Sequence, residues 1–294
     1  MTDPDWREWV DCRLCGSRDF RRLFAAERSG RQVVRCRRCG LVFYNPQPSA
    51  AQAAALYSTD YFETDFPESG AEAQVRLAHR RLDRIEREVC VGSLLDVGSG
   101  RGRFLSVALQ RGWNAVGLDV SPAAAAMART ASGARVFEGE LSGPPPPELG
   151  PVDVITLWDV LEHLGDPVGA LGAALDWLKP GGLLVVQTQN VNSVTASWMR
   201  SRWEQFVEFH LYHFSSSTLR MALERSGFEQ IRIEDVARYR ASGADDVPTA
   251  ASEATAVVRG WLQRVRDRLY ILAGRDAFNV MVATARRPME ITRW

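Results

Sequence analysis

The feature that most constrains the fold is a glycine-rich loop between an apolar, strand-like run and a helix-like segment. The stretch "LLDVGSGRGRF" occupies residues 94–104, with an acid at Asp96 and glycines at Gly98, Gly100 and Gly102. Such a loop lets a ligand approach the backbone closely, and the helix N-terminus after it offers free N–H groups. The stretch therefore predicts a ligand-binding turn in an α/β sheet.

Apolar runs and helical segments alternate from this loop onward. The helical segments lie near 102–111, 121–131 and 168–179, and the apolar runs lie at 93–97, 114–118, 152–157 and 182–188. Two later strands are expected in "EQIRIEDV" and "AFNVMVATAR". This alternation is typical of a parallel sheet covered by helices. The length of 294 residues allows one such domain together with a smaller module.

The spacing of the glycines narrows the choice of ligand. A dinucleotide-binding loop of pattern G-x-G-x-x-G, begun at Gly98, needs a glycine where Arg103 stands. Asp119 ends the next strand, about twenty residues beyond the loop, where an acid can accept both ribose hydroxyls and would repel a 2′-phosphate. The loop and Asp119 together predict an adenosine nucleoside without a pyrophosphate. A nicotinamide-dependent dehydrogenase is thereby disfavoured.

Four of the five cysteines form two C-x2-C pairs that match the spacing of structural zinc sites. They are Cys12, Cys15, Cys36 and Cys39. The glycine after each pair, Gly16 or Gly40, can take the left-handed conformation in which such a turn ends. Two disulfides or a redox-active C-x-x-C motif are the alternatives, but a reducing compartment disfavours the first and the duplication disfavours the second. With four sulfur ligands a zinc ion has no open position, so its expected role is structural.

The charge balance excludes a chain that binds polyanions over its whole surface, because 36 basic and 36 acidic side chains cancel. The cysteine-containing segment has a local excess of arginine over acidic residues, and these arginines either hold an anionic substrate or form a solvated face. No apolar run is long enough to span a membrane, and the N-terminus lacks the apolar core of a signal peptide. We therefore expect a cytoplasmic protein without membrane contact.

The motifs occur together in an order that resembles one family. "LLDVGSGRGRFL", "AVGLDVSP", "FEGEL", "VDVITLWDVLEHLGDP", "LKPGGLLVVQTQN" and "HLYHFSSSTLRMALERSGF" follow one another as in class I S-adenosylmethionine-dependent methyltransferases. More narrowly, the chain resembles members with an N-terminal C-x2-C zinc segment followed by "GLVFYNPQPS" and "YSTDYF". The resemblance covers roughly residues 12–236. It departs from the family at Ser99, often a cysteine, and at "QTQN", often "TPN".

The resemblance implies an α/β fold with a Rossmann-like sheet of seven strands and helices on both faces. A zinc-binding module is expected over 1–45, and a helical linker that serves as cofactor lid over 46–92, with Ser49 capping a short helix. The S-adenosylmethionine-binding methyltransferase domain is expected over 93–290, with a substrate-facing insert at about 190–225. The assembly is expected to be a monomer or a homodimer.

Cofactor roles carried over from the resemblance begin with the loop. Gly98, Gly100 and Gly102 let the methionine part of S-adenosylmethionine lie against the backbone. Asp96 supports the loop, and Asp119 binds the ribose.

Four further residues complete the expected cofactor site. Val120 flanks the adenine, and Glu140 lies near its amino group. Trp158 forms the floor of the pocket, and Tyr61 closes over it from the N-terminal side. Ordinary core packing is the alternative for both aromatic residues, and a surface carboxylate is the alternative for Glu140.

Methyl transfer from a sulfonium is an in-line displacement, so positioning supplies most of the catalysis and a base is needed only for a protonated acceptor. Among the four histidines, His210 is the first candidate because it follows the fifth strand, with Glu208 and His213 as polar neighbours. His163 is the second candidate, with Asp159 one turn earlier to orient its ring. His213 is the third candidate for the base.

The acceptor is expected to be a small molecule, such as a sugar, a glycan precursor or a secondary metabolite, with O-methylation favoured. An RNA methyltransferase that holds nucleic acid with its arginine-rich zinc module is the main alternative, although no Asn-Pro-Pro-aromatic motif is present. A non-catalytic binding scaffold is a further alternative, which the intact glycine loop disfavours.

Overall fold

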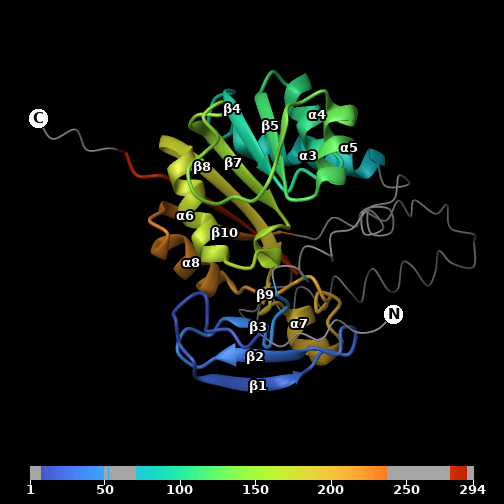
Figure 1. Ribbon diagram of the computed structural model, residues 1–294, viewed down its shortest axis with the longest axis vertical. Coiled ribbons are helices and arrows are strands. Elements are labelled where there is room, and N and C mark those ends of the chain that lie inside the picture. The colour runs from blue at the N-terminus through green and yellow to red at the C-terminus, as the bar shows by residue number, and fades with distance from the viewer. Residues whose placement is uncertain (1–7, 50–51, 53–70, 237–278, 290–294) are drawn as a thin grey trace, which may run out of the picture.

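The computed structural model describes residues 8–49, 52, 71–236 and 279–289. The described chain forms one sheet of seven strands and one of four. In Figure 1 the large sheet and its helices fill the upper part of the molecule, and the small sheet lies below them. Within the described ranges, no helix has the length and apolar character needed to cross a bilayer. The predicted seven-stranded α/β sheet is confirmed.

The large sheet has the order β10-β11-β8-β7-β4-β5-β6. Its strands are β4 (Ser93–Val97), β5 (Asn114–Asp119), β6 (Val136–Glu138), β7 (Val152–Trp158), β8 (Leu178–Gln189), β10 (Glu229–Val236) and β11 (Val280–Arg286). The pairs from β8 to β6 are parallel, whereas β11 runs antiparallel to both of its neighbours. Along the chain, β5 and β6 are added on one side of β4, and β7 and β8 are then added on its other side. This switch point lies between the carboxyl ends of β4 and β7, where open α/β sheets bind their ligands.

Helices cover both faces of this sheet, as predicted. One face carries α3 (Ala71–Glu86), α4 (Arg103–Gln110) and α5 (Pro122–Ser132), and the other carries α6 (Pro167–Trp177) and α8 (Ser216–Arg225). Successive strand residues point to opposite faces, so Leu94 packs in one apolar cluster and Leu95 in the other. This alternation explains why the central strands are apolar throughout: they are buried on both sides.

Short polar residues begin several of these helices. Ser121 caps α5 by accepting a hydrogen bond from the Ala124 N–H at 3.3 Å, and Ser215 begins α8 in a capping box with Thr218. Ser49 Oγ accepts from the Gln52 N–H at 3.3 Å, the contact expected of the N-cap predicted there. Within the expected lid over 46–92, residues 50, 51 and 53–70 lie outside the described ranges.

The small sheet joins two distant parts of the chain. Its strands, in spatial order, are β1 (Phe20–Ala25), β2 (Gln32–Cys36), β3 (Val42–Tyr44) and β9 (Tyr212–His213), and all pairs are antiparallel. β9 comes from the insert expected to face the substrate, and it pairs Val42 with His213 and Phe43 with Tyr212. The N-terminal module is therefore completed by a strand that follows it by more than 160 residues.

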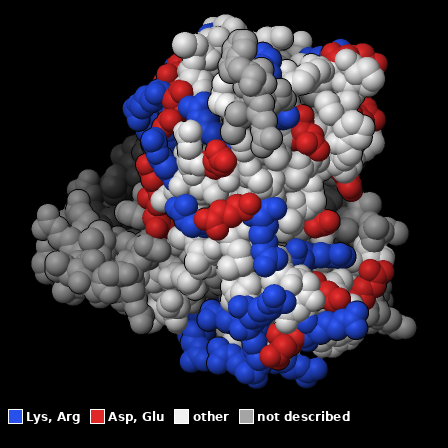
Figure 2. Space-filling view, turned by 90° about the vertical axis from the view of Figure 1, so that its left-hand side faces the viewer, with Lys and Arg blue, Asp and Glu red and all other residues white. Residues whose placement is uncertain are grey.

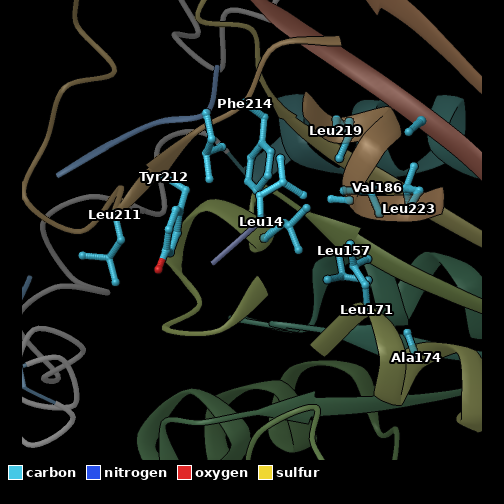
Figure 3. Packing of buried hydrophobic residues seen from close by; sticks show 14 of the residues in the cluster. Leu14, Leu157, Leu171, Ala174, Val186, Leu211, Tyr212, Phe214, Leu219 and Leu223 are labelled. Carbon is cyan, nitrogen blue, oxygen red and sulfur yellow. The ribbon is translucent and has the colours of Figure 1, made fainter. Parts of the chain in front are cut away.

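One apolar core extends through both sheets. Figure 3 shows Leu14, Tyr212, Phe214 and Leu219 within the same cluster as Val186 of β8. Burial of a large apolar side chain contributes about 1.5–3 kcal/mol. The N-terminal module therefore obtains much of its stability from packing on the large domain.

Aromatic residues of the insert take part in this core. The insert also contains α7 (Val194–Met199) and a 3-10 helix, η3 (Arg200–Arg202). Trp203 and Phe206 are 0% and 2% exposed, whereas Trp198 is 73% exposed. The insert thus packs most of its aromatic side chains in the core that it shares with the N-terminal module.

The loop glycines serve two different needs. A Cβ on Gly98 would lie 2.5 Å from Val160 Cγ2, and one on Gly102 would lie 2.8 Å from the backbone of Ala128. A Cβ on Gly100 would meet only the Gly98 carbonyl, at 4.0 Å. All three glycines have positive φ. Gly98 and Gly102 are therefore required by protein packing, while Gly100 borders open space.

Gly102→Ala should destabilise the fold by more than its positive φ alone explains, because the new methyl group overlaps helix α5. Gly133→Ala is the matched control, since Gly133 also has a positive φ but its Cβ position is open. We expect about 1 kcal/mol of destabilisation for the control and about 1–3 kcal/mol more than that for Gly102→Ala. Urea denaturation measures both, and equal losses would contradict this assignment.

Candidate active site

The carboxyl ends of β4 and β5 meet at the glycine loop, and Asp119 joins them. Its carboxylate accepts hydrogen bonds from the Gly100 N–H at 2.9 Å and from the Ser121 N–H at 3.0 Å. Burial raises the pKa of Asp119, and these two backbone donors oppose the rise. Asp119 therefore holds the loop in place, a role that the sequence analysis gave to Asp96.

Asp96 instead faces the interior of the sheet. It is 2% exposed, and its Oδ1 accepts a hydrogen bond from Thr156 Oγ1 on β7 at 2.7 Å. Burial raises the pKa of Asp96 to about 7, although Thr156 and the positive charge of Arg81 oppose the rise. Asp96 thus braces β4 against β7 directly beneath the switch point.

Arg81 is a site residue that the sequence analysis missed. Its side chain is 16% exposed, with the guanidinium carbon 4.2 Å from the ring centre of Trp158 and Nη2 3.6 Å from Asp159 Oδ2. Its Nε is buried without a hydrogen-bond partner in the described chain. The buried face of α3 contains Ala78, Leu82 and Ile85, and Arg81 borders this face. This position is the one sequence feature that indicates its burial. A buried guanidinium at the switch point is a ready binding group for a carboxylate.

The other residues of the expected cofactor site take up varied positions. Trp158 ends β7, half-buried, with its ring against Phe104 at 5.5 Å between centres. Val120 is 44% exposed just beyond β5, and Glu140 is exposed just beyond β6. Tyr61 lies outside the described residues. Their cofactor contacts remain predictions.

Two of the three candidate histidines lie together with a buried acid. Glu162, His163 and His210 each offer a ligand-type atom, and these atoms lie within 4.8 Å of one another. Glu162 and His163 belong to the 3-10 helix η2 (Leu161–His163) after β7. Thr188 of β8 donates to Glu162 at 2.9 Å, and burial raises the pKa of Glu162 well above its usual range. The three side chains of this cluster are of the types that exchange protons and bind metal ions.

His210 has its tautomer set by the backbone. Its Nδ1 lies 2.8 Å from the Gln205 carbonyl oxygen. A carbonyl can only accept, so Nδ1 carries the proton in the neutral ring and Nε2 carries the lone pair. Of the polar neighbours expected for His210, Glu208 pairs with Arg31 at 3.2 Å, and the His213 ring centre lies 6.5 Å from that of His210. Gln205 and, at 4.8 Å between ring centres, His163 also contact the His210 ring.

His163, the second candidate, lies beside Asp159 and Phe209. The Asp159 carboxylate accepts a hydrogen bond from Gln187 Nε2 at 2.6 Å and pairs with Arg81. Backbone groups of Phe209 and Asp159 contact the His163 ring. Burial lowers the pKa of His163 to about 4, so the ring is neutral near pH 7.

His213 lies in an aromatic environment on β9. It is 0% exposed, with Phe206, Tyr44 and Trp203 at 4.5, 5.3 and 6.1 Å between ring centres. Both ring nitrogens are buried without a hydrogen-bond partner in the described chain, and burial lowers the pKa to about 3. This environment suits packing better than proton transfer.

The four paired cysteines converge at one end of the small sheet. The Cys12–Cys39 and Cys15–Cys36 sulfurs are 3.5 Å apart, and all four lie within 4.8 Å. Zn–S bonds of about 2.3 Å in a tetrahedron separate the sulfurs by about 3.8 Å, so the cluster fits a zinc ion. Gly16 and Gly40 have φ values of +69° and +83°, the left-handed turns expected there.

The arginine excess of the N-terminal module lies largely at the surface. Figure 2 shows Lys and Arg side chains gathered over the lower part of the molecule, with acidic side chains among them. Arg18 pairs with Asp11 at 2.9 Å and Arg37 with Asp19 at 3.2 Å, and all four side chains are largely exposed. Much of this surface is thus a solvated, partly ion-paired face.

A family model for the methyltransferase domain matches residues 69–233, which is more than half of the chain. The chain belongs to this family, and its Rossmann-like sheet is that of the S-adenosylmethionine-dependent class I methyltransferases. The structural neighbours include an S-adenosylmethionine-dependent methyltransferase from Archaeoglobus fulgidus, with 17% identity, a TM-score of 0.54 and coverage of 77% of this chain and 98% of that one. Phosphoethanolamine N-methyltransferase 2 of Haemonchus contortus gives 18% identity, a TM-score of 0.52 and coverage of 84% and 63%. These likenesses show the fold.

Curated relatives include ubiquinone biosynthesis O-methyltransferases. The protein of Pseudomonas aeruginosa (strain UCBPP-PA14) is 35% identical over 104 residues, 34% of this chain and 45% of the relative. That of Xylella fastidiosa (strain 9a5c) is 29% identical over 166 residues, 53% of this chain and 64% of the relative. The chain thus spans about half the length of the curated relatives it matches.

The burial of His213 predicts a pH dependence of stability. Its folded pKa lies below its unfolded value of 6.5, so the unfolded chain binds more protons between about pH 3 and 6.5 and stability rises with pH across that window. His213→Phe should reduce this slope by up to about 1.4 kcal/mol per pH unit. Urea denaturation at pH 4.5 and 7.5 measures the slope, with His79→Gln, an exposed position, as control. An unchanged slope in His213→Phe would disprove the assignment.

Proposed function

We propose that the protein transfers the methyl group of S-adenosylmethionine to a hydroxyl group of a small molecule. The observation that carries this proposal is His210, whose Nδ1–H bond to Gln205 leaves the lone pair on Nε2 at the edge of the sheet where open α/β folds bind ligands. The names of the curated relatives, which are O-methyltransferases, support an oxygen acceptor. The choice between a sugar, a glycan precursor and another secondary metabolite depends on the test below.

The cofactor site proposed here combines three kinds of contact. Gly100 provides the open backbone surface for the methionine part, and Asp119 has acceptor capacity left for the ribose hydroxyls. Arg81 faces the same switch point and is suited to the carboxylate of the methionine part. When bound, S-adenosylmethionine supplies an activated methyl group on a sulfonium.

The protein's own contribution to the reaction is positioning and proton removal. His210 accepts the acceptor's hydroxyl proton on Nε2, while the Gln205 carbonyl holds the ring by Nδ1–H and stabilises it once it is protonated. His163, neutral because it is buried, packs against His210 without adding a second positive charge. We do not propose His213 as the base, because its ring is fully buried among aromatic side chains.

The four-cysteine cluster is proposed to bind one structural zinc ion. Its four sulfurs complete a tetrahedron and leave no position for a substrate. Because zinc binding needs reduced thiols, we further propose that the protein acts in the cytoplasm, as a monomer or a homodimer.

Cofactor identity and acceptor class can be tested with purified protein. Calorimetry should show binding of S-adenosylmethionine and none of NAD. Methyl-labelled cofactor should then be offered to catechols, sugars, nucleotide sugars and RNA, with products identified by mass spectrometry. Methylation of a small-molecule hydroxyl supports the proposal, whereas labelled RNA alone or tight NAD binding would overturn it.

Asp119→Ala should weaken S-adenosylmethionine binding at least tenfold, because hydrogen bonds to a charged group contribute about 1.5–3 kcal/mol each. Gly100→Val should weaken it further, because the side chain fills the open space of the loop. Glu148→Ala, at an exposed turn, is the control. Calorimetry measures the affinities and thermal unfolding reports the fold. Normal binding by both loop variants would place the cofactor elsewhere.

His210→Ala should slow transfer to a hydroxyl acceptor by about 100- to 10,000-fold with cofactor affinity retained, because the acceptor keeps its proton. His163→Ala should have a smaller effect, and His79→Ala none. Single-turnover assays with labelled cofactor give the rates. A loss below tenfold in both His210→Ala and His163→Ala would exclude a histidine base and indicate an acceptor that is already nucleophilic.

Cys36→Ser should lower the zinc content from one ion per chain and lower the stability of the fold, since the metal holds the two C-x2-C turns together. Elemental analysis and thermal unfolding measure the two effects, with Cys90→Ser, an exposed cysteine outside the cluster, as control. Two bound metals in the wild type, one of them lost in His210→Ala, would instead place a metal at the histidine cluster.

A further inference from the structure

The hairpin formed by β1 and β2 reaches from the cysteine cluster to the segment that carries His210. The tip of this hairpin is residues 27–31, and the histidine segment is residues 200–211. Cys36 ends β2 at one end of the hairpin, and the tip lies at the other. The sequence separates the tip from the histidine segment by about 170 residues, but hydrogen bonds connect them along their length.

Backbone and side-chain contacts fix the start of the histidine segment. The Glu27 N–H donates to the Ser201 carbonyl oxygen at 2.9 Å, and Ser201 Oγ donates back to Glu27 Oε1 at 2.9 Å. Arg28 Nη1 donates to the Glu204 carbonyl oxygen at 3.3 Å. The tip therefore binds the main chain of the histidine segment as well as its side chains.

An ion pair fixes the part of the histidine segment just before His210. Arg31 Nη2 donates to Glu208 Oε1 at 3.2 Å, and the two side chains are 11% and 37% exposed. Glu208 lies within the turn that the His210 N–H closes on the Val207 carbonyl at 3.2 Å. Movement of Glu208 therefore moves His210.

The histidine segment has little regular structure to hold itself in place. Its own backbone bonds are isolated turns, such as Trp203 N–H to the Arg200 carbonyl and Phe206 N–H to the Trp203 carbonyl. Ordering a residue costs roughly 1–2 kcal/mol in backbone entropy, so such a segment needs contacts from outside. The buried side chains of Trp203 and Phe206 anchor its middle. Hydrogen bonds come from the hairpin tip and from β3, where the Tyr44 N–H donates to the Leu211 carbonyl at 3.0 Å.

We propose that Arg31 is a positioning residue that, through Glu208, keeps the His210 ring on the Gln205 carbonyl, and that the metal-bound cysteine cluster holds Arg31 through β2. The strand of five residues places the cysteines roughly 17 Å from the tip, too far for the metal to touch a substrate. The N-terminal module thus sets the tautomer of His210 without contributing a reacting group. The role of His210 as base rests on the proposed function, whereas the contact between module and ring does not.

The test is nuclear magnetic resonance of the histidine rings in the full-length protein, with isotope-labelled histidine, at a pH where the rings are neutral. The chain has only four histidines, so single His→Gln variants assign each ring. In the wild type, His210 should give the nitrogen shifts of the Nδ1–H form. Arg31→Gln and Glu208→Gln should move them toward the Nε2–H form that imidazole favours in water.

Two comparisons separate positioning from general loosening. The charge-swapped double variant Arg31→Glu/Glu208→Arg should restore much of the wild-type tautomer. Arg18→Gln, which removes an exposed ion pair of the same module distant from the histidine segment, should leave it unchanged. Removal of the metal by a chelator should act like Arg31→Gln. Once an acceptor is known, Arg31→Gln should lower kcat and leave cofactor affinity unaltered.

The proposal is overturned if the His210 shifts stay at their wild-type values in both Arg31→Gln and Glu208→Gln, or if Arg18→Gln changes them equally. Glu208→Gln keeps the test valid if Arg31→Gln fails to fold, because the Glu208 side chain is more exposed. Failure of the proposed function has a different signature. The protein would then bind no S-adenosylmethionine or transfer no methyl group, while the His210 tautomer would still respond to Arg31.

Discussion

The pairing of β9 with β3 is the interaction on which the rest of the structure depends. It consists of two residue pairs, Val42 with His213 and Phe43 with Tyr212. It adds the fourth strand to the small sheet and joins the apolar core of that sheet to the core of the large domain. A module of about forty residues buries too little surface to be stable alone. Metal binding at one end and packing on the large domain along its length are complementary solutions to this shortage.

The same pairing links the module to the chemistry of the site. His210 lies in a stretch of irregular turns, and irregular backbone is precise only when its surroundings fix it. The hairpin tip, β3 and the Gln205 carbonyl together provide that fixation. The resulting architecture places the cofactor loop on the rigid sheet and the proposed base on a segment shared between two modules. Such an arrangement lets acceptor specificity vary without disturbing the cofactor loop.

The cofactor loop shows how one motif divides its tasks. Gly98 and Gly102 are needed because neighbouring protein atoms occupy the space of a Cβ, whereas Gly100 borders open space. Asp119 binds the loop through the Gly100 N–H, and Asp96 braces β4 on β7. A sequence motif treats these positions as one group because they are close together in the chain. Only the contacts reveal which residue borders open space, which holds the loop and which braces the sheet.

The sequence by itself determined the seven-stranded sheet, its helices, the glycine loop and the four-cysteine cluster. The helices, the loop and the cysteine spacing depend on local periodicity or on spacing within about thirty residues, and the count of seven strands follows from the resemblance to the class I methyltransferase family. Only the tertiary structure decided that β9 joins the N-terminal sheet, that Arg81 lies over Trp158 and that His210 turns to Gln205 while His213 is buried among aromatic rings. These features depend on which distant surfaces meet. The sequence identifies a histidine but does not say whether its neighbour will be water, as at the surface, a carbonyl, as at His210, or aromatic rings, as at His213.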